Sequence, residues 1–395
     1  MATAEREYRT DPWQNDEIDG GARNGTDTAD GESLDRVLAV YGPTNIEKIE
    51  RHVKPLADVV ETTLVCTAEN PDVTAVRQLS PPSTGIRIVD LLLMALLTVV
   101  ESVRGEYDAV VSISLVPHGC LGLVAARWMG VPAHLGIIGY DIDVHARSWY
   151  APPIRALIRQ FDAVTVPGPT HRRRLHESVG LPPWKTAILA NPIDVDQLPA
   201  TRRDSDARYD LVWVGRFTEE KRPLLFVDVV EELAKREPSV RAVMLGDGPQ
   251  LPAAKRRIQE RDLGENLLTP GWVDDPIPWY ADAKLFALTS KRDALPLTLI
   301  EAMASETVPV APPVGNVSDL LIDDWNGVLV DPATVDGFAT AIEALLDAPE
   351  RRRRLGKNAR GVRDRFSYRA AAEDWRYVTG VLAASDRYSR GSSAP

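Results

Sequence analysis

Short apolar runs that alternate with helix-length segments constrain the fold of this chain most. The runs are rich in β-branched residues and lack polar alternation, which is typical of parallel strands covered on both faces. The first half contains "RVLAVYG", "ETTLVCTA", "YDAVVSIS", "PAHLGIIG" and "FDAVTVPG", and the second half contains "YDLVWVGRF", "VRAVMLGDG", "LLTPGW", "AKLFALTS", "TVPVAPP" and "GVLVDP". Because helical segments such as "RPLLFVDVVEELAKREP" separate them, the sequence predicts an α/β architecture with doubly wound sheets.

A break between Pro192 and Tyr209 divides these elements into two halves. The stretch has two prolines, a cluster of charges and no apolar periodicity, as linkers do. A chain of 395 residues is long enough for two domains. We therefore predict an N-terminal Rossmann-like domain over residues 34–197, a linker at 198–208 and a C-terminal domain over 209–368. Ligands are expected at the carboxyl ends of the strands, in a cleft between the domains.

Both ends of the chain have the composition of disordered segments. Residues 1–33 are rich in Asp, Glu, Gly, Thr and Asn and have almost no aliphatic side chains, so they predict a disordered acidic tail. The last residues, 388–395, are interpreted in the same way.

Charge, cysteine content and the start of the chain exclude several classes of protein. A net charge of −11 argues against nucleic acid as a partner, because phosphate backbones select basic surfaces. Cys66 and Cys120 have no metal-type spacing, so two unreactive interior thiols are favoured. The start, "MATAEREYRTDPWQ", lacks the apolar region of a signal peptide, which predicts a cytoplasmic protein.

The most apolar segment, "LLLMALLTVV" at 91–100, lies between Asp90 and Glu101. It is too short to span a bilayer, and a buried helix is the favoured interpretation. A helix that dips into the membrane remains the alternative, so peripheral contact with the inner membrane face stays open. Two basic runs, "HRRRLHESVG" and "RRRRLGKNARGVRDRF", are interpreted as solvated helix faces, with contact to lipid headgroups or a lipid phosphate as the alternative.

The segment "GRFTEEKRP" ends a strand and leads into a helix near Pro223. Gly215 permits close backbone approach, while Arg216 and Lys221 place two cations at the helix start. A helix N-terminus adds backbone donors and partial positive charge, so the segment predicts a phosphate site. A surface turn whose cations are neutralised by the two adjacent glutamates is the alternative.

The segment "MLGDGPQ" ends another strand, with Gly246 and Gly248 on either side of an aspartate. These glycines allow positive φ and leave room for a flat ring, although most such motifs are only turns. No GxxxxGK[ST] motif occurs, which excludes a P-loop NTPase. No GxGxxG motif follows the first strand, which argues against a nicotinamide dehydrogenase.

The segment "KRDALPLTLIEAMA" combines a largely apolar helix with two acids. Pro296 suits the first helical turn, and the N–H groups around Leu297 and Thr298 point back toward Asp293. Glu301 lies five residues past Pro296, which is about 7.5 Å further along the helix axis at 1.5 Å per residue. It either pairs with a basic side chain or is kept for a ligand. The spacing suits an extended ligand such as a nucleotide sugar, with one acid for each sugar.

These motifs, in this order and spacing, resemble those of family-4 glycosyltransferases. The resemblance rests on "VGRFTEEKRP", "GDGP", "GWVDD", "DALPLTLIE" followed by "AMA", and "NGVLVDP", and "LANPIDVDQL" is similar to the Asn-Gly-Ile-Asp segment of that family. It covers roughly residues 35 to 385. It implies the GT-B fold, in which two Rossmann-like domains face a cleft and the C-terminal one binds the donor. The last helix, at 369–387, is then expected to cross back onto the N-terminal domain.

The resemblance also implies roles for individual residues. Arg216 and Lys221 match the cations that bind the diphosphate, Glu301 the acid at the donor ribose, and Leu297 and Thr298 the amides at the phosphate. Asp293 stands where the family has the Glu that touches the transferred hexose. The implied donor-binding set is Gly215, Arg216, Lys221, Gly246, Gly248, Trp272, Leu297, Thr298 and Glu301.

In the first half, "GVPAHLGIIGYDIDVHA" is similar to a family segment that reads His-Gly-x-Asp, with Ile138 in place of His. Asp141 is retained, and His145 is a candidate for the cleft. Either side chain is a candidate to orient the acceptor hydroxyl or accept its proton. Asp141–Asp143 resembles the metal motif of a different glycosyltransferase fold, but the GT-B resemblance implies no metal and no other cofactor.

The sequence therefore predicts a retaining glycosyltransferase that moves a hexosyl unit from a nucleotide diphosphate sugar to a hydroxyl of a sugar or lipid-linked acceptor, in cell-surface glycan, glycolipid or protein-glycan assembly. The resemblance implies front-face attack, with the leaving phosphate taking the acceptor proton. Two alternatives stay open: a nucleotide-sugar epimerase of the same fold, and a non-catalytic protein that binds nucleotide sugars.

Overall fold

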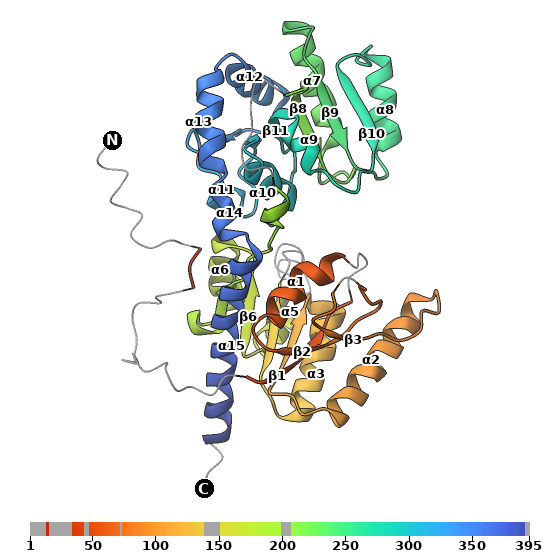
Figure 1. Ribbon diagram of the computed structural model, residues 1–395, viewed down its shortest axis with the longest axis vertical. Coiled ribbons are helices and arrows are strands. Elements are labelled where there is room, and N and C mark those ends of the chain that lie inside the picture. Colours follow the sequence, from red (N-terminus) through yellow and green to blue (C-terminus); the bar gives the residue numbers. More distant parts are fainter. Residues whose placement is uncertain are drawn as a thin grey trace, which may run out of the picture. The chain divides into compact units, whose positions relative to one another are not determined.

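The computed structural model describes residues 13–15, 34–42, 47–71, 73–137, 151–198 and 207–391. They form two α/β units, one made of Met1–Pro192 with Tyr368–Pro395 and the other of Ile193–Ser367 (Figure 1). Each unit contains one parallel sheet, of seven and six strands respectively. The strand orders are those of doubly wound sheets, so the predicted fold class of two Rossmann-like units is confirmed.

Unit 1 has the strand order β3-β2-β1-β4-β5-β6-β7. Its strands are β1 (Arg36–Val40), β2 (Glu61–Val65), β3 (Arg77–Leu79), β4 (Ala109–Ile113), β5 (Ala133–Gly136), β6 (Ala163–Val166) and β7 (Thr186–Ile188). Its helices are α1 (Glu47–Ala57), α2 (Arg87–Arg104), α3 (Cys120–Met129), α5 (Ala151–Ile158), α6 (Pro169–Arg174) and α15 (Tyr368–Gly391), with short helical turns at Leu115–Gly119, Leu175–Val179 and Pro183–Lys185. The central strands are buried, because β1, β4 and β5 carry almost only apolar side chains.

Helix α15 is the last helix of the chain, and it packs on unit 1 against α1, β6 and β7. Trp375 is buried there, and its ring lies 5.1 Å from the ring of the equally buried His134. The Asp374 carboxylate accepts a hydrogen bond from the backbone N–H of Ala190 at 2.8 Å. An apolar stripe and one buried carboxylate therefore join this helix to the sheet.

Residues 13–15 differ from the expectation of a tail without ordered contacts. Trp13 is buried, and the Asn15 amide pairs with the backbone of Ile188, donating at 2.9 Å and accepting at 2.8 Å. Asn15 also donates to Asp374 at 3.1 Å. One buried indole and a bidentate amide hold this short segment in place, although its neighbourhood in the sequence is acidic and polar.

Unit 2 has the strand order β10-β9-β8-β11-β12-β13. Its strands are β8 (Tyr209–Val214), β9 (Ala242–Leu245), β10 (Leu267–Gly271), β11 (Ala283–Ala287), β12 (Val308–Ala311) and β13 (Val328–Leu329). Its helices are α7 (Pro223–Arg236), α8 (Leu251–Glu260), α9 (Ile277–Ala281), α10 (Leu297–Ala304), α11 (Val317–Leu320), α12 (Val335–Leu346), α13 (Pro349–Ala359) and α14 (Val362–Arg365), with a short helical turn at Val195–Gln197. Trp213, Phe217, Phe226 and Phe338 lie in its core.

Three local features differ from the predictions. The edge strands β3 and β7 were not predicted, because both are only three residues long, β3 has no apolar run, and the run at β7 is short. The prediction of a buried helix at 91–100 is wrong for one side of α2, where Leu92 and Leu96 are more than half exposed. Among the described helices, none has the length and apolarity needed to cross a membrane.

The basic run at the start of α13 is tied to the rest of unit 2. The side chain of Arg352 is buried and donates to the carbonyls of Leu345 and Leu346 at 2.6 Å, which satisfies the C-terminal end of α12. Arg351 and Arg354 both pair with Asp324. This part of the run therefore has a structural role and is not simply a solvated face.

Both cysteines carry free thiols. Cys66 is buried, and burial raises the pKa of its thiol to about 12, so it stays protonated as an interior thiol was expected to. Cys120, at the start of α3, is partly exposed.

Candidate functional site

The predicted residues of unit 2 come from loops at the carboxyl edge of its sheet and from helix α10. Strand β8 leads by way of α7 to β9 on one side, whereas β11, also a neighbour of β8, leads to β12 on the other. The loops after β8 and β11 therefore diverge, and in doubly wound sheets ligands bind at this switch point. Residues 215–222 and 288–296 make up these two loops.

An ion pair joins the two loops. The ammonium of Lys221 pairs with the carboxylate of Asp293, and both side chains are about one-sixth exposed, at 17% and 16%. The Ser290 hydroxyl lies 3.2 Å from the same carboxylate oxygen of Asp293. Lys221 and Asp293 were predicted to contact separate parts of one ligand, and in the structure they also bind each other.

Backbone contacts fix this pair in place. The N–H of Lys291 donates to the carbonyl of Glu220 at 2.7 Å, and the Thr289 hydroxyl donates to the carbonyl of Lys221 at 2.7 Å. The buried indole of Trp213 donates to the Thr289 oxygen at 2.9 Å. The position of the Lys221 backbone is thus set from the core of the unit, through the buried side chains of Thr289 and Trp213.

The loop after β12 holds Asp293 from the other side. Gly315 has φ +59°, and a Cβ on it would lie 1.7 Å from the carbonyl oxygen of Asp293. The next residue, the buried Asn316, donates to the carbonyl of Ala294 from its backbone at 2.7 Å and from its side chain at 3.0 Å. Only glycine permits this close approach.

The glycines after β8 and β9 also serve close backbone approach. A Cβ on Gly246, at φ +126°, would lie 2.0 Å from the carbonyl oxygen of Gly215, and one on Gly248, at φ +150°, would lie 2.8 Å from the backbone of Phe217. The Phe217 N–H donates to the carbonyl of Asp247 at 2.8 Å. These glycines were predicted to leave room for a flat ring. In the structure, backbone atoms of the neighbouring loop fill the space next to both glycines.

Arg216 lies in the loop after β8, next to Phe217, and its side chain is exposed to solvent. No carboxylate of a described residue pairs with it. Lys221, by contrast, is paired with Asp293. The next residue, Arg222, has a left-handed φ of +51°, and there the chain turns into α7. The two predicted cations therefore differ: one is held by an acid and the other is available to an anion.

The first turn of α10 lies next to Asp293 in the chain. The helix begins at Leu297, one residue later than predicted, with Pro296 extended at its N-cap, and no side chain caps it. No described residue accepts a hydrogen bond from the N–H of Leu297 or Thr298. These donors and the positive end of the helix are suited to an anion.

Glu301 is partly buried on α10 and accepts a hydrogen bond from the Tyr280 hydroxyl at 3.2 Å. Burial, with the neighbouring Glu301 carboxylate, raises the pKa of Tyr280 well above its usual value, so the hydroxyl stays a neutral donor. The apolar faces of α10 are buried as predicted, because Leu299, Ile300 and Met303 are fully enclosed.

Trp272 lies apart from this cluster. It follows β10 and Gly271, is 65% exposed, and its indole N–H donates to Asp274 at 3.2 Å. No hydrogen bond or ion pair between described residues joins it to Lys221, Asp293 or Glu301.

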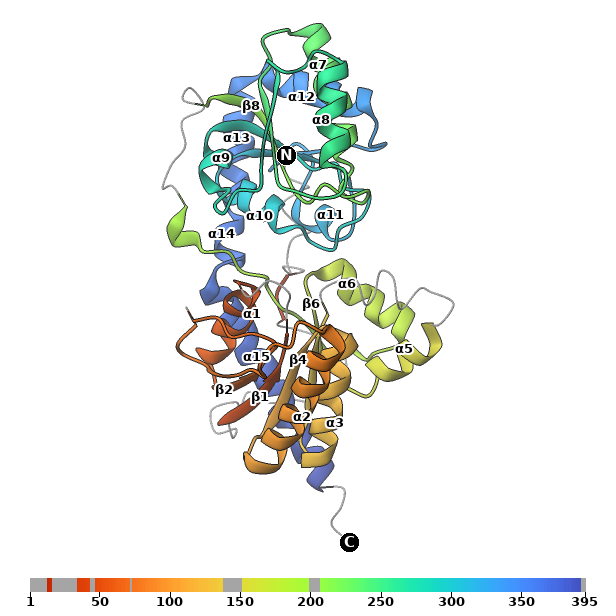
Figure 2. The same ribbon diagram turned by 90° about the vertical axis from the view of Figure 1, so that its right-hand side faces the viewer.

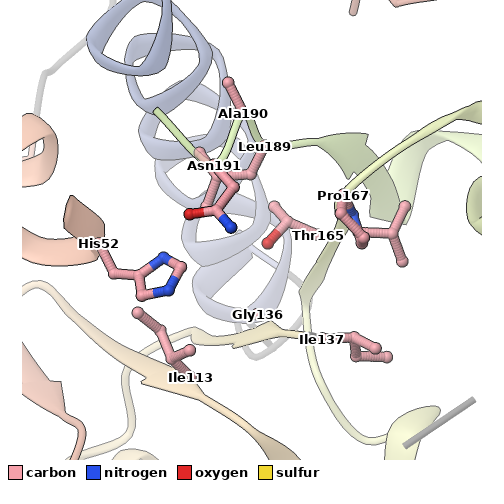
Figure 3. Close-up of a pocket in the computed structure, with 10 residues that line it drawn as sticks. His52, Ile113, Gly136, Ile137, Thr165, Pro167, Leu189, Ala190 and Asn191 are labelled. Atoms are coloured by element: carbon pink, nitrogen blue, oxygen red, sulfur yellow. The ribbon is translucent and has the colours of Figure 1, made fainter. Parts of the chain in front are cut away.

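In unit 1 the predicted residues Asp141 and His145, with Ile138, lie outside the described residues. What the described part of unit 1 does show is a small pocket at the carboxyl ends of β4, β5 and β6 (Figure 3). His52 and Asn191 lie on its walls, together with Thr165. The side-chain amide oxygen of Asn191, Oδ1, is buried without a hydrogen-bond partner among the described residues.

His52 was not among the residues predicted from the sequence. Burial and the nearby Arg51 and Lys48 lower the pKa of His52 to about 3, so its imidazole is neutral. The signal was its place on the first helix after β1, among the apolar Ile49, Val53 and Leu56. That pattern also describes an ordinary core helix, so only the fold could point to a pocket.

Comparison with known proteins finds matches to both the sequence and the fold of this chain. Residues 196–362, within unit 2, match the family model described as "Glycosyl transferases group 1". An alpha-D-kanosaminyltransferase of Streptomyces kanamyceticus is 31% identical over 156 residues, which cover 39% of this chain and 40% of that protein. A D-inositol 3-phosphate glycosyltransferase of Corynebacterium diphtheriae is 29% identical over 60% of this chain and 61% of that protein. The chain thus aligns with less than two-thirds of the length of these relatives.

Solved structures match over more of the chain. Anabaena Alr3699/HepE, determined in complex with UDP and glucose, has a TM-score of 0.70 at 17% identity and covers 85% of this chain and 97% of its own. A sucrose-phosphate synthase from Thermosynechococcus elongatus has a TM-score of 0.66 at 17% identity and covers 91% of this chain and 100% of its own. The chain therefore has the GT-B fold of these structures, and residues 196–362 match the family model of the group 1 glycosyl transferases.

Proposed function

We propose that this chain is a cytoplasmic, retaining glycosyltransferase that moves a hexosyl unit from a nucleotide diphosphate sugar to the hydroxyl of a sugar or lipid-linked acceptor. The observation that carries the proposal is the Lys221–Asp293 pair at the switch point of unit 2, next in the chain to the uncapped first turn of α10. UDP-glucose is the first donor to test, because a structural relative was solved with it.

In this proposal the chemistry is chiefly electrostatic. Lys221, Arg216 and the N–H groups of Leu297 and Thr298 stabilise the negative charge of the departing diphosphate, which removes the need for a metal ion. Asp293, which holds Lys221 in the free protein, accepts hydrogen bonds from the hydroxyls of the transferred hexose. Glu301 binds the ribose. The acceptor hydroxyl attacks from the same face, and the leaving phosphate takes its proton.

The first experiment measures thermal stability of the protein against a panel of nucleotide sugars and nucleotides, with a chelator present. A donor at 100 times its Kd adds about 2.7 kcal/mol of stability, so binding gives a clear shift. The shift should be reduced in Glu301→Gln, a variant that keeps an acceptor for the Tyr280 hydroxyl but loses the charge at the ribose. The Lys284→Ala variant is the control, because Lys284 pairs with Asp210 at the start of β8.

The second experiment follows release of the nucleotide with and without candidate acceptors. A transferase needs an acceptor for rapid release, whereas an epimerase of this fold releases UDP without one. Binding without any turnover would instead identify a nucleotide-sugar-binding protein. Absence of a shift with every nucleotide sugar would overturn the assignment of the donor site.

A further inference from the structure

The outward face of α2 in unit 1 is apolar along its whole length. Its exposed side chains follow spacings of four, four, three and four residues, so they form a single stripe. We name this the α2 stripe; it consists of Ile88, Leu92, Leu96, Val99 and Val103, whose exposed fractions are 72%, 63%, 60%, 49% and 63%.

The inward face of α2 carries the polar groups. Glu101, only 6% exposed, accepts hydrogen bonds from the hydroxyl of Tyr107 at 2.7 Å and from Arg77 at 3.0 Å. Thr98 and Ser102 are buried beside it. A helix that covers a sheet normally has the opposite arrangement, so packing within unit 1 gives no reason for the α2 stripe.

Helix α3 also exposes large apolar side chains. It packs against α2, and the two helices lie side by side in both views (Figures 1 and 2). Trp128 on α3 is 74% exposed and Val124 is 64% exposed. An exposed tryptophan and an apolar stripe on two helices that pack together are typical of a surface that meets the lipid–water interface.

The charged side chains that α2 and α3 expose are three arginines and, in part, Asp90, and Glu106 is exposed two residues beyond the end of α2. Arg87 and Arg104 stand exposed at the two ends of α2, and Arg127 is exposed beside Trp128. The Asp90 carboxylate is turned back to cap Thr84, accepting from its N–H and hydroxyl at 2.7 Å. In a chain with a net charge of −11, the excess of arginine on these two helices is complementary to an anionic surface.

We propose that unit 1 docks on an anionic lipid bilayer through the α2 stripe and Trp128, with α2 lying in the plane of the headgroups. The stripe is about 23 Å long at 1.5 Å per residue, and the helix lies along the membrane surface instead of crossing it. A second copy of the chain fits less well. In either orientation of two paired α2 helices, the arginines at their ends would oppose one another.

The test is sedimentation of the full-length protein with vesicles of phosphatidylcholine alone or mixed with phosphatidylglycerol. We expect binding to the mixed vesicles that weakens as salt is added. The double variant Leu92→Gln with Leu96→Gln should lower the partition coefficient by at least about 10-fold, because it removes two buried aliphatic side chains from the interface. Arg104→Gln should lower it by about fivefold.

Trp128→Ser and Trp184→Ser form a matched pair, since Trp184 in unit 1 is 68% exposed but lies outside the α2 stripe. Only the first should weaken binding, and circular dichroism should show that both variants fold. Wild-type protein that stays in the supernatant with anionic vesicles, or a double variant that binds as the wild type does, overturns the proposal. A wild-type dimer that the double variant converts to a monomer, without vesicle binding, assigns the stripe to a second copy and overturns it as well.

Discussion

At the scale of single residues, Lys221 carries the most specific prediction. Replacing it with alanine removes a preorganised cation and leaves Asp293 without its ammonium partner in a site that is mostly buried. We expect kcat to fall by about 100-fold or more, as for the loss of other preorganised charge contacts. Steady-state kinetics at saturating donor measures this, with Lys284→Ala as the control. A rise in KM with kcat unchanged would show that Lys221 only binds the donor.

Gly315 is a second residue whose role is set by geometry. An alanine there would place a carbon atom against the carbonyl oxygen of Asp293, so Gly315→Ala should push this loop away and cost roughly 2 kcal/mol or more of stability. The Gly264→Ala variant is the matched control, because a Cβ at Gly264 meets no atom within 4 Å. Denaturant unfolding compares the two variants. Equal midpoints would show that the Asp293 loop adapts without cost.

At the scale of elements, His134 on β5 ties the stability of unit 1 to pH. Burial lowers the pKa of His134 to about 3, whereas an unfolded histidine has a pKa of about 6.5. Below pH 6.5 the unfolded chain binds a proton that the folded chain does not, so the free energy of unfolding falls as pH decreases from about 6.5 to 3. Each pH unit in this window costs up to about 1.4 kcal/mol for this residue. Denaturant unfolding at pH 5 and pH 7 should show a smaller pH effect in His134→Gln than in the wild type.

That variant keeps an amide that can reach Thr165, which bonds the His134 ring at 3.0 Å. The His134 ring also packs against Trp375 of α15. A loss of this packing in the variant would lower its stability equally at both pH values. A pH dependence that is identical in the two proteins would assign the acid sensitivity to other groups.

At the scale of the whole molecule, the two units have separate hydrophobic cores, and the proposed donor site belongs to one of them. Calorimetry should therefore resolve two transitions, of which a bound nucleotide sugar raises the one from unit 2. His134→Gln supplies the assignment, because it should shift only the transition of unit 1. A single transition that shifts as a whole with the ligand would show that the units unfold together.

The sequence alone determined the alternation of strands and helices in both units and the loops that carry the candidate residues. Continuous apolar runs in the sequence predict long buried strands, and every strand of four residues or more was predicted in this way. The three-residue edge strand β3 has no such run, and β7 has only the short run from Ala187 to Ala190. The motifs around Lys221, Asp293 and Glu301 are likewise local, because each lies in one loop or one helical turn.

Only the tertiary structure decided how these pieces act on each other. Lys221 and Asp293 are 72 residues apart in the chain, and their pairing depends on β8 and β11 being neighbours in the sheet. The glycines at 246, 248 and 315 make room for neighbouring loops, which no local pattern reveals. Helix α2 shows the same limit, because its composition predicts burial while the packing of its polar face leaves the apolar face outside. Burial and pairing are properties of distant contacts, and a sequence pattern records only what a residue and its near neighbours prefer.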